Sequence, residues 1–223
     1  ADHAIHIDPI IRLWLLRILV PLGGQREFVH NHGFSDDTVA EAIGLGYWID
    51  PSPNDFDPKA VRTELRQLHQ RAEKQLSQST LPASLRQNIS QLSELVGLSS
   101  TDCRVLEFAV SIQNERLLDD AADWLGQLSS TKVFHTLSTL LDLPEPNIRA
   151  SLGSQGILAR SGLVSIDHSG SSFLRCKLNL LSDAFADQMA TAETNPVSLL
   201  RGTVAIAPPA QLSLSDYHHV QAT

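Results

Sequence analysis

Two pairs of histidines are the first residues in this chain that could hold a metal ion. His30 and His32 are one residue apart in a polar stretch, and His218 and His219 are adjacent near the C-terminal end. Helical zinc sites place two histidines four residues apart, and many structural sites add a Cys-x-x-Cys pair; neither pattern is present. We therefore interpret both pairs as solvated loop histidines and predict no metal site.

A group of acidic residues could serve a hydrolase as paired carboxylates. Asp119, Asp120 and Asp123 are close together in sequence, and Asp36 is followed by Asp37. Both groups follow the start of a predicted helix, where the helix dipole stabilises negative charge. This explanation requires no catalysis, and we favour it over an acid–base pair.

The nucleophile and phosphate-binding motifs of common enzymes do not occur in the chain. There is no Gly-x-Ser-x-Gly sequence, and none of the four lysines follows a glycine, so a P-loop is excluded. Cys103 and Cys176 stand alone, which predicts reduced thiols in the core and a cytoplasmic protein rather than a disulfide framework. We predict no catalytic, cofactor-binding or metal-binding residue in this stretch.

The elements that would position any functional residue centre on 98–181, which have the order of a winged helix-turn-helix. Apolar residues at helical spacing predict helices over 101–112 and 117–125, a third from about Ser130, and a fourth from Asn147 that Gly162 ends. Two short β-type runs, 163–167 and 173–178, flank a His-Ser-Gly-Ser-Ser turn and predict a hairpin.

A winged helix can bind DNA or another protein, and its exposed residues would make the contact. For DNA, the helix from Asn147 would enter the major groove and the hairpin would touch the backbone. The candidate contact residues, for nucleic acid or for a protein partner, are Asn147, Arg149, Ser151, Ser154, Gln155, Arg160, Arg175 and Lys177. Residues 98–182 carry seven Lys and Arg against nine Asp and Glu, which favours protein contacts over DNA.

The flanking segments predict a mainly α protein in three parts. Helices over 9–20, 37–43, 58–78 and 85–96 predict a helical domain at 1–96. The winged-helix domain would cover 97–191, including an amphipathic packing helix at 179–191. Residues 192–223 contain two adjacent prolines and predict an extended arm. The helix at 9–20 is apolar on most sides and must be buried on several of them.

The totals of the chain agree with a folded protein of ordinary size. It has 223 residues, 42% of them hydrophobic, and a formal net charge of −8, which argues against bulk phosphate binding. Its most apolar run is interrupted by charges and is shorter than the ~20 residues of a membrane span. Because the sequence begins with Ala rather than Met, we expect a piece of a longer protein.

Several runs resemble the region before the motor in a group of bacterial AAA-family ATPases. They are NISQLSELVGLSSTDCRVLEFAV, LLDDAADWLG, ASLGSQGILARSGLVSID and NPVSLLRGTVAIAPPAQLSLSDYHHV, which together span roughly 85–223. The most telling pieces are Leu-x-x-Ser-Gly-Leu at 158–163 and Leu-Ser-x-x-Asp-Tyr at 212–217. In that family the arm leads into a helical segment and then the P-loop.

The resemblance implies a non-catalytic recognition or regulatory region that acts through protein contacts. ATP and Mg²⁺ would bind only in the parent protein, whose nucleotide-binding residues have no counterpart here. The partner would be another protein or the ATPase core of the same chain, and no membrane is expected. A DNA-binding regulator is the alternative, and a stand-alone enzyme is a third hypothesis with only the His pairs and the Asp group to support it.

Overall fold

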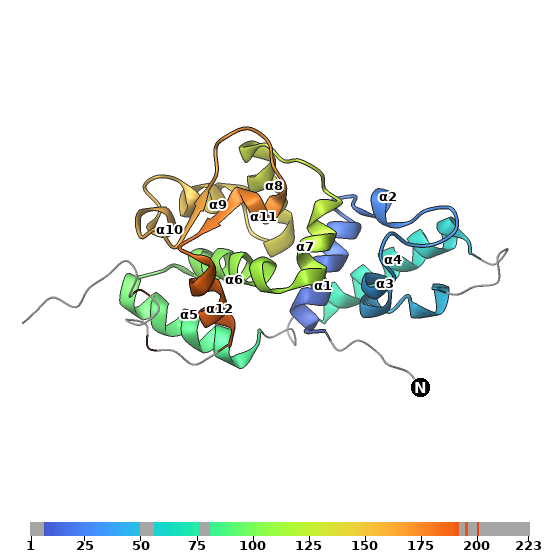
Figure 1. Cartoon of the computed structure of the whole chain (residues 1–223), viewed down its shortest axis with the longest axis horizontal. Coiled ribbons are helices and arrows are strands. Elements are labelled where there is room, and N and C mark those ends of the chain that lie inside the picture. Colours follow the sequence, from blue (N-terminus) through green and yellow to red (C-terminus); the bar gives the residue numbers. More distant parts are fainter. Residues whose placement is uncertain (1–6, 50–55, 76–80, 192–194, 196–199, 201–223) are drawn as a thin grey trace, which may run out of the picture.

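The computed structural model describes residues 7–49, 56–75, 81–191, 195 and 200, and these residues form helices with one small β-hairpin (Figure 1). In chain order the elements are α1 (Pro9–Leu19), α2 (Gln25–Phe28), α3 (Asp37–Ile43), the 3₁₀ turn η1 (Gly46–Trp48), α4 (Pro58–Lys74), α5 (Ala83–Val96), α6 (Ser100–Asn114), α7 (Arg116–Asp123), α8 (Ser130–Leu141), α9 (Glu145–Leu152), α10 (Ile157–Arg160), β1 (Val164–Ile166), α11 (Leu174–Lys177), β2 (Leu178–Leu180) and α12 (Asp183–Thr191). The prediction of a mainly α chain with a small hairpin is confirmed.

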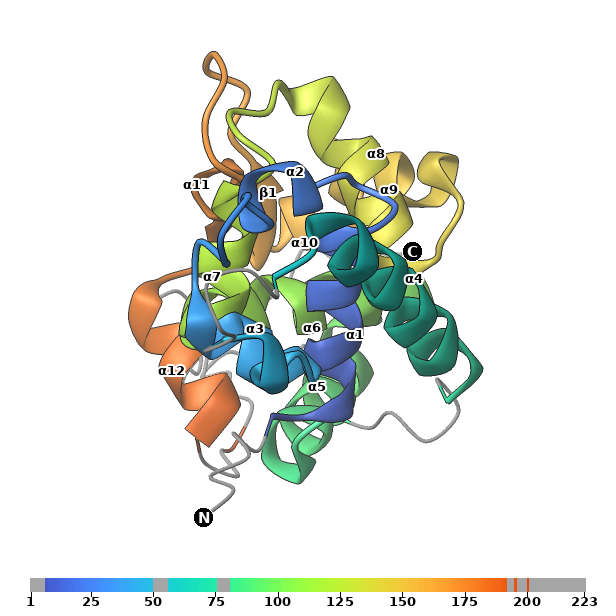
Figure 2. The same ribbon diagram turned by 90° about the vertical axis from the view of Figure 1, so that its right-hand side faces the viewer.

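Helix α1 lies at the centre of the molecule, among α2, α3, α4, α7 and α8 (Figure 2). Pro9 suits the first turn because its missing N–H would have no intrahelical partner there. From Ile10 to Leu19, every residue except the half-buried Arg12 is buried. The indole of Trp14 meets the ring of Phe108 in α6 edge to face at 5.1 Å. The prediction that this helix is covered on several sides is confirmed.

Helices α6, α8 and α9 pack on one another and precede the hairpin, in the predicted order. Ser99 begins α6 with a capping box, in which its hydroxyl accepts from the N–H of Asp102 and the Asp102 side chain accepts from the N–H of Ser99. Ser129 caps α8, and Asp142 ends it in the left-handed conformation. We call residues 98–181 the central unit.

The helix predicted from Asn147 to Gly162 is wrong in its extent. Helix α9 begins two residues earlier, with Pro146 in its first turn, and ends at Leu152; the chain turns at 153–156 before α10. The turn requires a glycine at position 156. A Cβ there would lie only 2.1 Å from the carbonyl oxygen of Ser151, so the chain folds back at a distance that only glycine permits.

The second predicted strand is also misplaced, because 174–177 form the helical turn α11 and the strand β2 follows it. Leu174 and Lys177 are both completely buried. Side chains three residues apart share a face on a helix but lie on opposite faces of a strand, so burial of both favours the helical turn. The hairpin itself is antiparallel, with Ser165 opposite Asn179.

The C-terminal packing helix begins at Asp183 rather than Asn179. Asn179 and Leu180 belong to β2, and the hydroxyl of Ser182 accepts from the N–H of Phe185 at 3.0 Å, which starts α12 there. Helix α12 packs on α5 and α6, and Ser84 in α5 donates to the carbonyl oxygen of Ala190. The predicted contact of this helix with the rest of the fold is therefore correct, while its start is not.

One cluster of buried hydrophobic side chains runs from Ile10 to Met189 and includes helices on both sides of residue 97. The division at 96/97 stays a prediction about the organisation of the chain. The arm predicted at 192–223 lies outside the described residues, apart from Asn195 and Leu200. Leu200 packs against the core cluster. Among the helices that the structure describes, none combines the length and apolarity needed to cross a membrane.

Candidate functional site

A groove of about 320 Å³ lies between the start of α6 and the turn that joins α9 to α10. Three of the predicted contact residues line it: Asn147, Ser151 and Gln155. Ser99 and Thr101 form the α6 side, and Ile157 supplies an apolar wall. The walls are thus mostly uncharged and polar, which suits a peptide or protein surface that brings hydrogen-bonding groups of its own.

Asp102 lies in this groove and joins its two sides. Its Oδ2 accepts from the backbone N–H of Ser99 at 2.8 Å and from the Ser99 hydroxyl at 2.7 Å, while its Oδ1 accepts from the hydroxyl of Ser151. Asp102 and Ser151 are both buried, so the bond between them is shielded from water. Both oxygens are occupied by protein groups, and the carboxylate therefore fixes α9 against α6 instead of acting as a free base.

The structure buries two of the predicted contact residues, which is a correction. Ser151 faces α6 and is only 6% exposed. Lys177 is completely buried, and its Nζ donates to the carbonyl oxygens of Asp167 and Gly170, so it anchors the loop between the strands. Neither side chain is available to a partner. The exposed candidates are Asn147, Arg149, Ser154, Gln155, Arg160 and Arg175.

Arg149 and Arg175 are exposed, but both are already bound within the chain. Nε and Nη2 of Arg149 donate to Oε1 of Glu145 at 2.8 and 2.6 Å, and its guanidinium lies 4.5 Å from the ring centre of Phe134. Arg175 donates to Gln113 at 2.7 Å and to Asp119 at 3.0 Å. Positive charge that these pairs neutralise is less available to phosphate groups.

Arg160 differs from these two arginines. It is exposed at the end of α10, and no ion pair joins it to another residue in the described part of the chain. It stands in the same turn region as Gln155, which lines the groove. Of the four basic groups predicted for contact, Arg160 is the one that a partner could reach without breaking an existing interaction.

The acidic group on α7 forms ion pairs and does not converge on a cavity. Arg116 binds Asp120 at 2.7 Å, and Arg175 binds Asp119 at 3.0 Å. Asp123 is the last residue of α7, so the prediction that the helix dipole favours it is wrong. Burial and the neighbouring carboxylates of Asp119 and Asp120 raise the pKa of Asp123.

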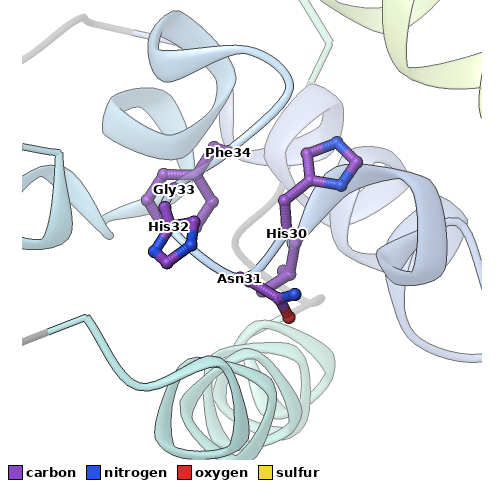
Figure 3. Close-up of a pocket in the computed structure, with 6 residues that line it drawn as sticks. His30, Asn31, His32, Gly33 and Phe34 are labelled. Carbon is purple, nitrogen blue, oxygen red and sulfur yellow. The ribbon is translucent and has the colours of Figure 1, made fainter.

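The His30–His32 loop forms a second hollow, of about 540 Å³, lined by 29–34 (Figure 3). The two imidazoles lie on opposite sides of the loop and do not face one another (Figure 3). His30 Nε2 lies 2.8 Å from the Ser35 hydroxyl. Among the residues whose positions are described, no group of three or more His, Cys, Asp and Glu is arranged to hold a metal. His218 and His219 lie outside the described residues.

The two cysteines are unpaired, as the sequence predicts. Cys176 is exposed on α11, so the prediction that it belongs to the core is wrong. Burial raises the pKa of the half-buried Cys103. A raised pKa keeps a thiol protonated, so Cys103 is a poor nucleophile at neutral pH. The Asp102–Ser151 contact is not among the predicted features. The Ser-x-x-Asp spacing of a capping box is its only signal in the sequence, and Ser151 of α9 is 49 residues away from Asp102.

No model of a known protein family, no curated protein and no solved structure matches this chain.

Proposed function

We propose that this chain is a non-catalytic recognition or regulatory region of an AAA-type ATPase and acts through protein–protein contacts. The proposal is supported by basic side chains of the central unit that already have partners within the chain. Arg149 and Arg175 form ion pairs, and Lys177 is buried. A DNA-binding face needs free Lys and Arg to neutralise phosphates. A protein-binding face does not, and its centre is typically depleted of charge.

The groove between α6 and α9 is the contact site in this proposal. Asn147 and Gln155 are its exposed polar residues on the side of α9, and Ile157 is its apolar wall. The Asp102–Ser151 bond holds the two sides at a constant separation, so a partner binds with little loss of side-chain freedom. The partner is another protein or the motor of the same chain, in the cytoplasm.

A test uses the full-length protein that contains this chain. Changing Asn147 and Gln155 together to Lys places two long charged side chains in the groove. We therefore expect a change in the steady-state ATPase rate, or in the response of that rate to the partner protein, while the affinity for nucleotide stays the same. Gln70→Lys, at an exposed polar position of α4, is the matched control. Equal behaviour of both variants, or ATP hydrolysis by residues 1–223 alone, contradicts the proposal.

A DNA-binding regulator is the second candidate, and one observation favours it. The exposed Arg160 forms no ion pair within the described residues, and it ends the helix that follows the turn containing Gln155, a side chain of a type that reads bases. This function predicts salt-dependent duplex binding that Arg149→Ala or Arg160→Ala abolishes. A low-salt gel shift with the purified chain decides between the two functions, because protein recognition predicts no shifted band.

A further inference from the structure

Tyr47 carries a large aromatic ring into solvent at the end of the molecule opposite the groove. Its side chain is 64% exposed, the highest value among the large hydrophobic residues that the structure describes. It lies in η1, beside α3 and near α4, whereas α9 and α10 are at the other end of the long axis (Figure 1). An exposed aromatic of this kind is typical of a contact site.

The ring of Tyr47 belongs to a supported aromatic surface. Its centre lies 5.4 Å from that of Trp48, at an interplanar angle of 38°. Trp48 in turn meets Phe56 edge to face at 5.8 Å, and Phe56 meets Phe34 at 5.4 Å. The row continues inward to the buried ring of Phe28. Tyr47 and Trp48 are thus held by the core and need little ordering when a partner binds.

Glu64 of α4 places a carboxylate at the edge of the two rings. Its Oε2 accepts from the hydroxyl of Tyr47 and from the indole Nε1 of Trp48, the latter at 3.1 Å. Its Oε1 receives no hydrogen bond from any residue that the structure describes, and Glu64 forms no ion pair with them. One carboxylate oxygen therefore remains for a donor from outside the chain.

The surrounding charges favour a cation. Between 36 and 66, the residues that the structure describes include five Asp and Glu against three Lys and Arg, a net −2. Arg62, one of the three, donates to the carbonyl oxygen of Val29. In the central unit, by contrast, Asp119, Asp120 and Glu145 have arginine partners. The acidic side chains that the structure describes between 36 and 66 form no ion pair with another described residue.

We propose that Tyr47, Trp48 and Glu64 bind an arginine side chain of a partner protein. A planar guanidinium stacks on the face of a tyrosine or tryptophan and donates to a carboxylate at its edge, and all three groups are present here. Lysine has a compact, strongly hydrated head group and makes a poorer stack. This surface is separate from the groove, and its occupant does not depend on the function proposed for the groove.

The experiment titrates the purified chain with an acetylated and amidated Gly-Ser-Arg-Gly-Arg-Ser-Gly peptide. Binding is followed by the NMR shift of the Trp48 indole N–H, which reports on this surface directly. We expect saturable binding that weakens with salt, and about tenfold weaker binding after Tyr47→Ala or Glu64→Gln. The same peptide with lysine in place of arginine binds less tightly, and one with neutral citrulline does not bind.

Two matched controls separate this site from general attraction between opposite charges. Phe173→Ala removes another exposed aromatic, and Glu94→Gln removes another exposed carboxylate. Both variants should retain the affinity of the unaltered chain. Affinity that is equal in Tyr47→Ala and Phe173→Ala, equal affinity for the lysine peptide, or no shift of the Trp48 signal at millimolar peptide would overturn the proposal.

Discussion

Arg17 and Glu73 form a bidentate ion pair, with Nε 2.7 Å from Oε1 and Nη2 2.7 Å from Oε2. The third nitrogen, Nη1, donates to the carbonyl oxygen of Leu140 at 2.6 Å. The pair therefore joins α1, α4 and α8, which lie on both sides of residue 97. Arg17 is only 2% exposed, so its charge depends on these partners. His69 lies 3.0 Å from the same carboxylate.

Removing Glu73 should destabilise the whole fold. Glu73→Ala leaves the buried guanidinium of Arg17 without its counter-ion, and we expect the free energy of unfolding to fall by about 2–3 kcal/mol, since Glu73 itself is one-third exposed. Urea denaturation measures this. Glu94→Ala, on the exposed face of α5, is the control and should change stability by less than about 0.5 kcal/mol. Equal effects of the two variants would show that the pair is unimportant.

Glu107 should make stability fall as the pH rises from about 4.5 to about 7. Burial raises the pKa of Glu107 to about 7, although the charge of Arg104 opposes the shift. A carboxyl with a raised folded-state pKa stabilises the fold while it is protonated, and this contribution is lost above the folded pKa. Glu107→Gln keeps the shape without the charge, so we expect it to gain about 1–3 kcal/mol at pH 8.

The measurement for Glu107 is the free energy of unfolding at intervals between pH 4 and pH 8. Glu73 provides an internal contrast, because the hydrogen bond from Arg17 lowers the pKa of Glu73. Its contribution is present above pH ~4.5 and is lost as the pH falls through the lowered value. A Glu107→Gln variant with the same slope between pH 5 and pH 7 as the unaltered chain would show that another group causes the dependence.

Lys177→Met should loosen the loop between the strands and leave the helices intact. The substitution keeps most of the buried volume but removes the donor to the carbonyl oxygens of Asp167 and Gly170. We expect faster amide exchange across 167–172 and a loss of about 1–2 kcal/mol. Lys132→Met, at an exposed lysine of α8, is the matched control and should leave exchange in this loop unchanged.

Gly156→Ala should disturb the groove. The new Cβ would lie 2.1 Å from the carbonyl oxygen of Ser151, so the turn must move away from α9. We expect a loss of about 2 kcal/mol or more, together with faster exchange in α9 and α10. Ser154→Ala, in the same turn but exposed, should be silent in both measurements. Unfolding curves that coincide for the two variants would refute the close approach.

The predictions that succeeded from sequence were those in which local rules and burial agree. Pro9 and the apolar residues that follow it on most sides identify α1 as a buried helix, and the predicted bounds of α3 match those observed. The order of helices and hairpin in the central unit follows from the same periodicity. Each of these signals involves residues that are close together in sequence, so a short segment of the chain is enough to recognise it.

The predictions were wrong where contacts between distant parts of the chain determine whether a side chain is buried. Serine is usually found at the surface, yet Ser151 is buried, and Asp102 accepts a hydrogen bond from its hydroxyl across the groove. Lysine is usually exposed and available to a partner, yet the ammonium group of Lys177 is enclosed by the loop between the strands, whose carbonyl oxygens it binds. The spacing of residues along the sequence does not predict the burial of either side chain, because the polar partner is remote in sequence for Ser151 and is a backbone carbonyl for Lys177.

The amino-acid order alone determined the helical class, the presence of a hairpin after the helices and the lack of a P-loop, because periodicity, caps and motifs act over short distances. Tertiary structure decided which charges are available. The pairing of Arg149 and Arg175, the burial of Lys177 and the exposure of Tyr47 beside Glu64 depend on how separate helices meet, since electrostatic and packing energies depend on distance in space and not along the chain.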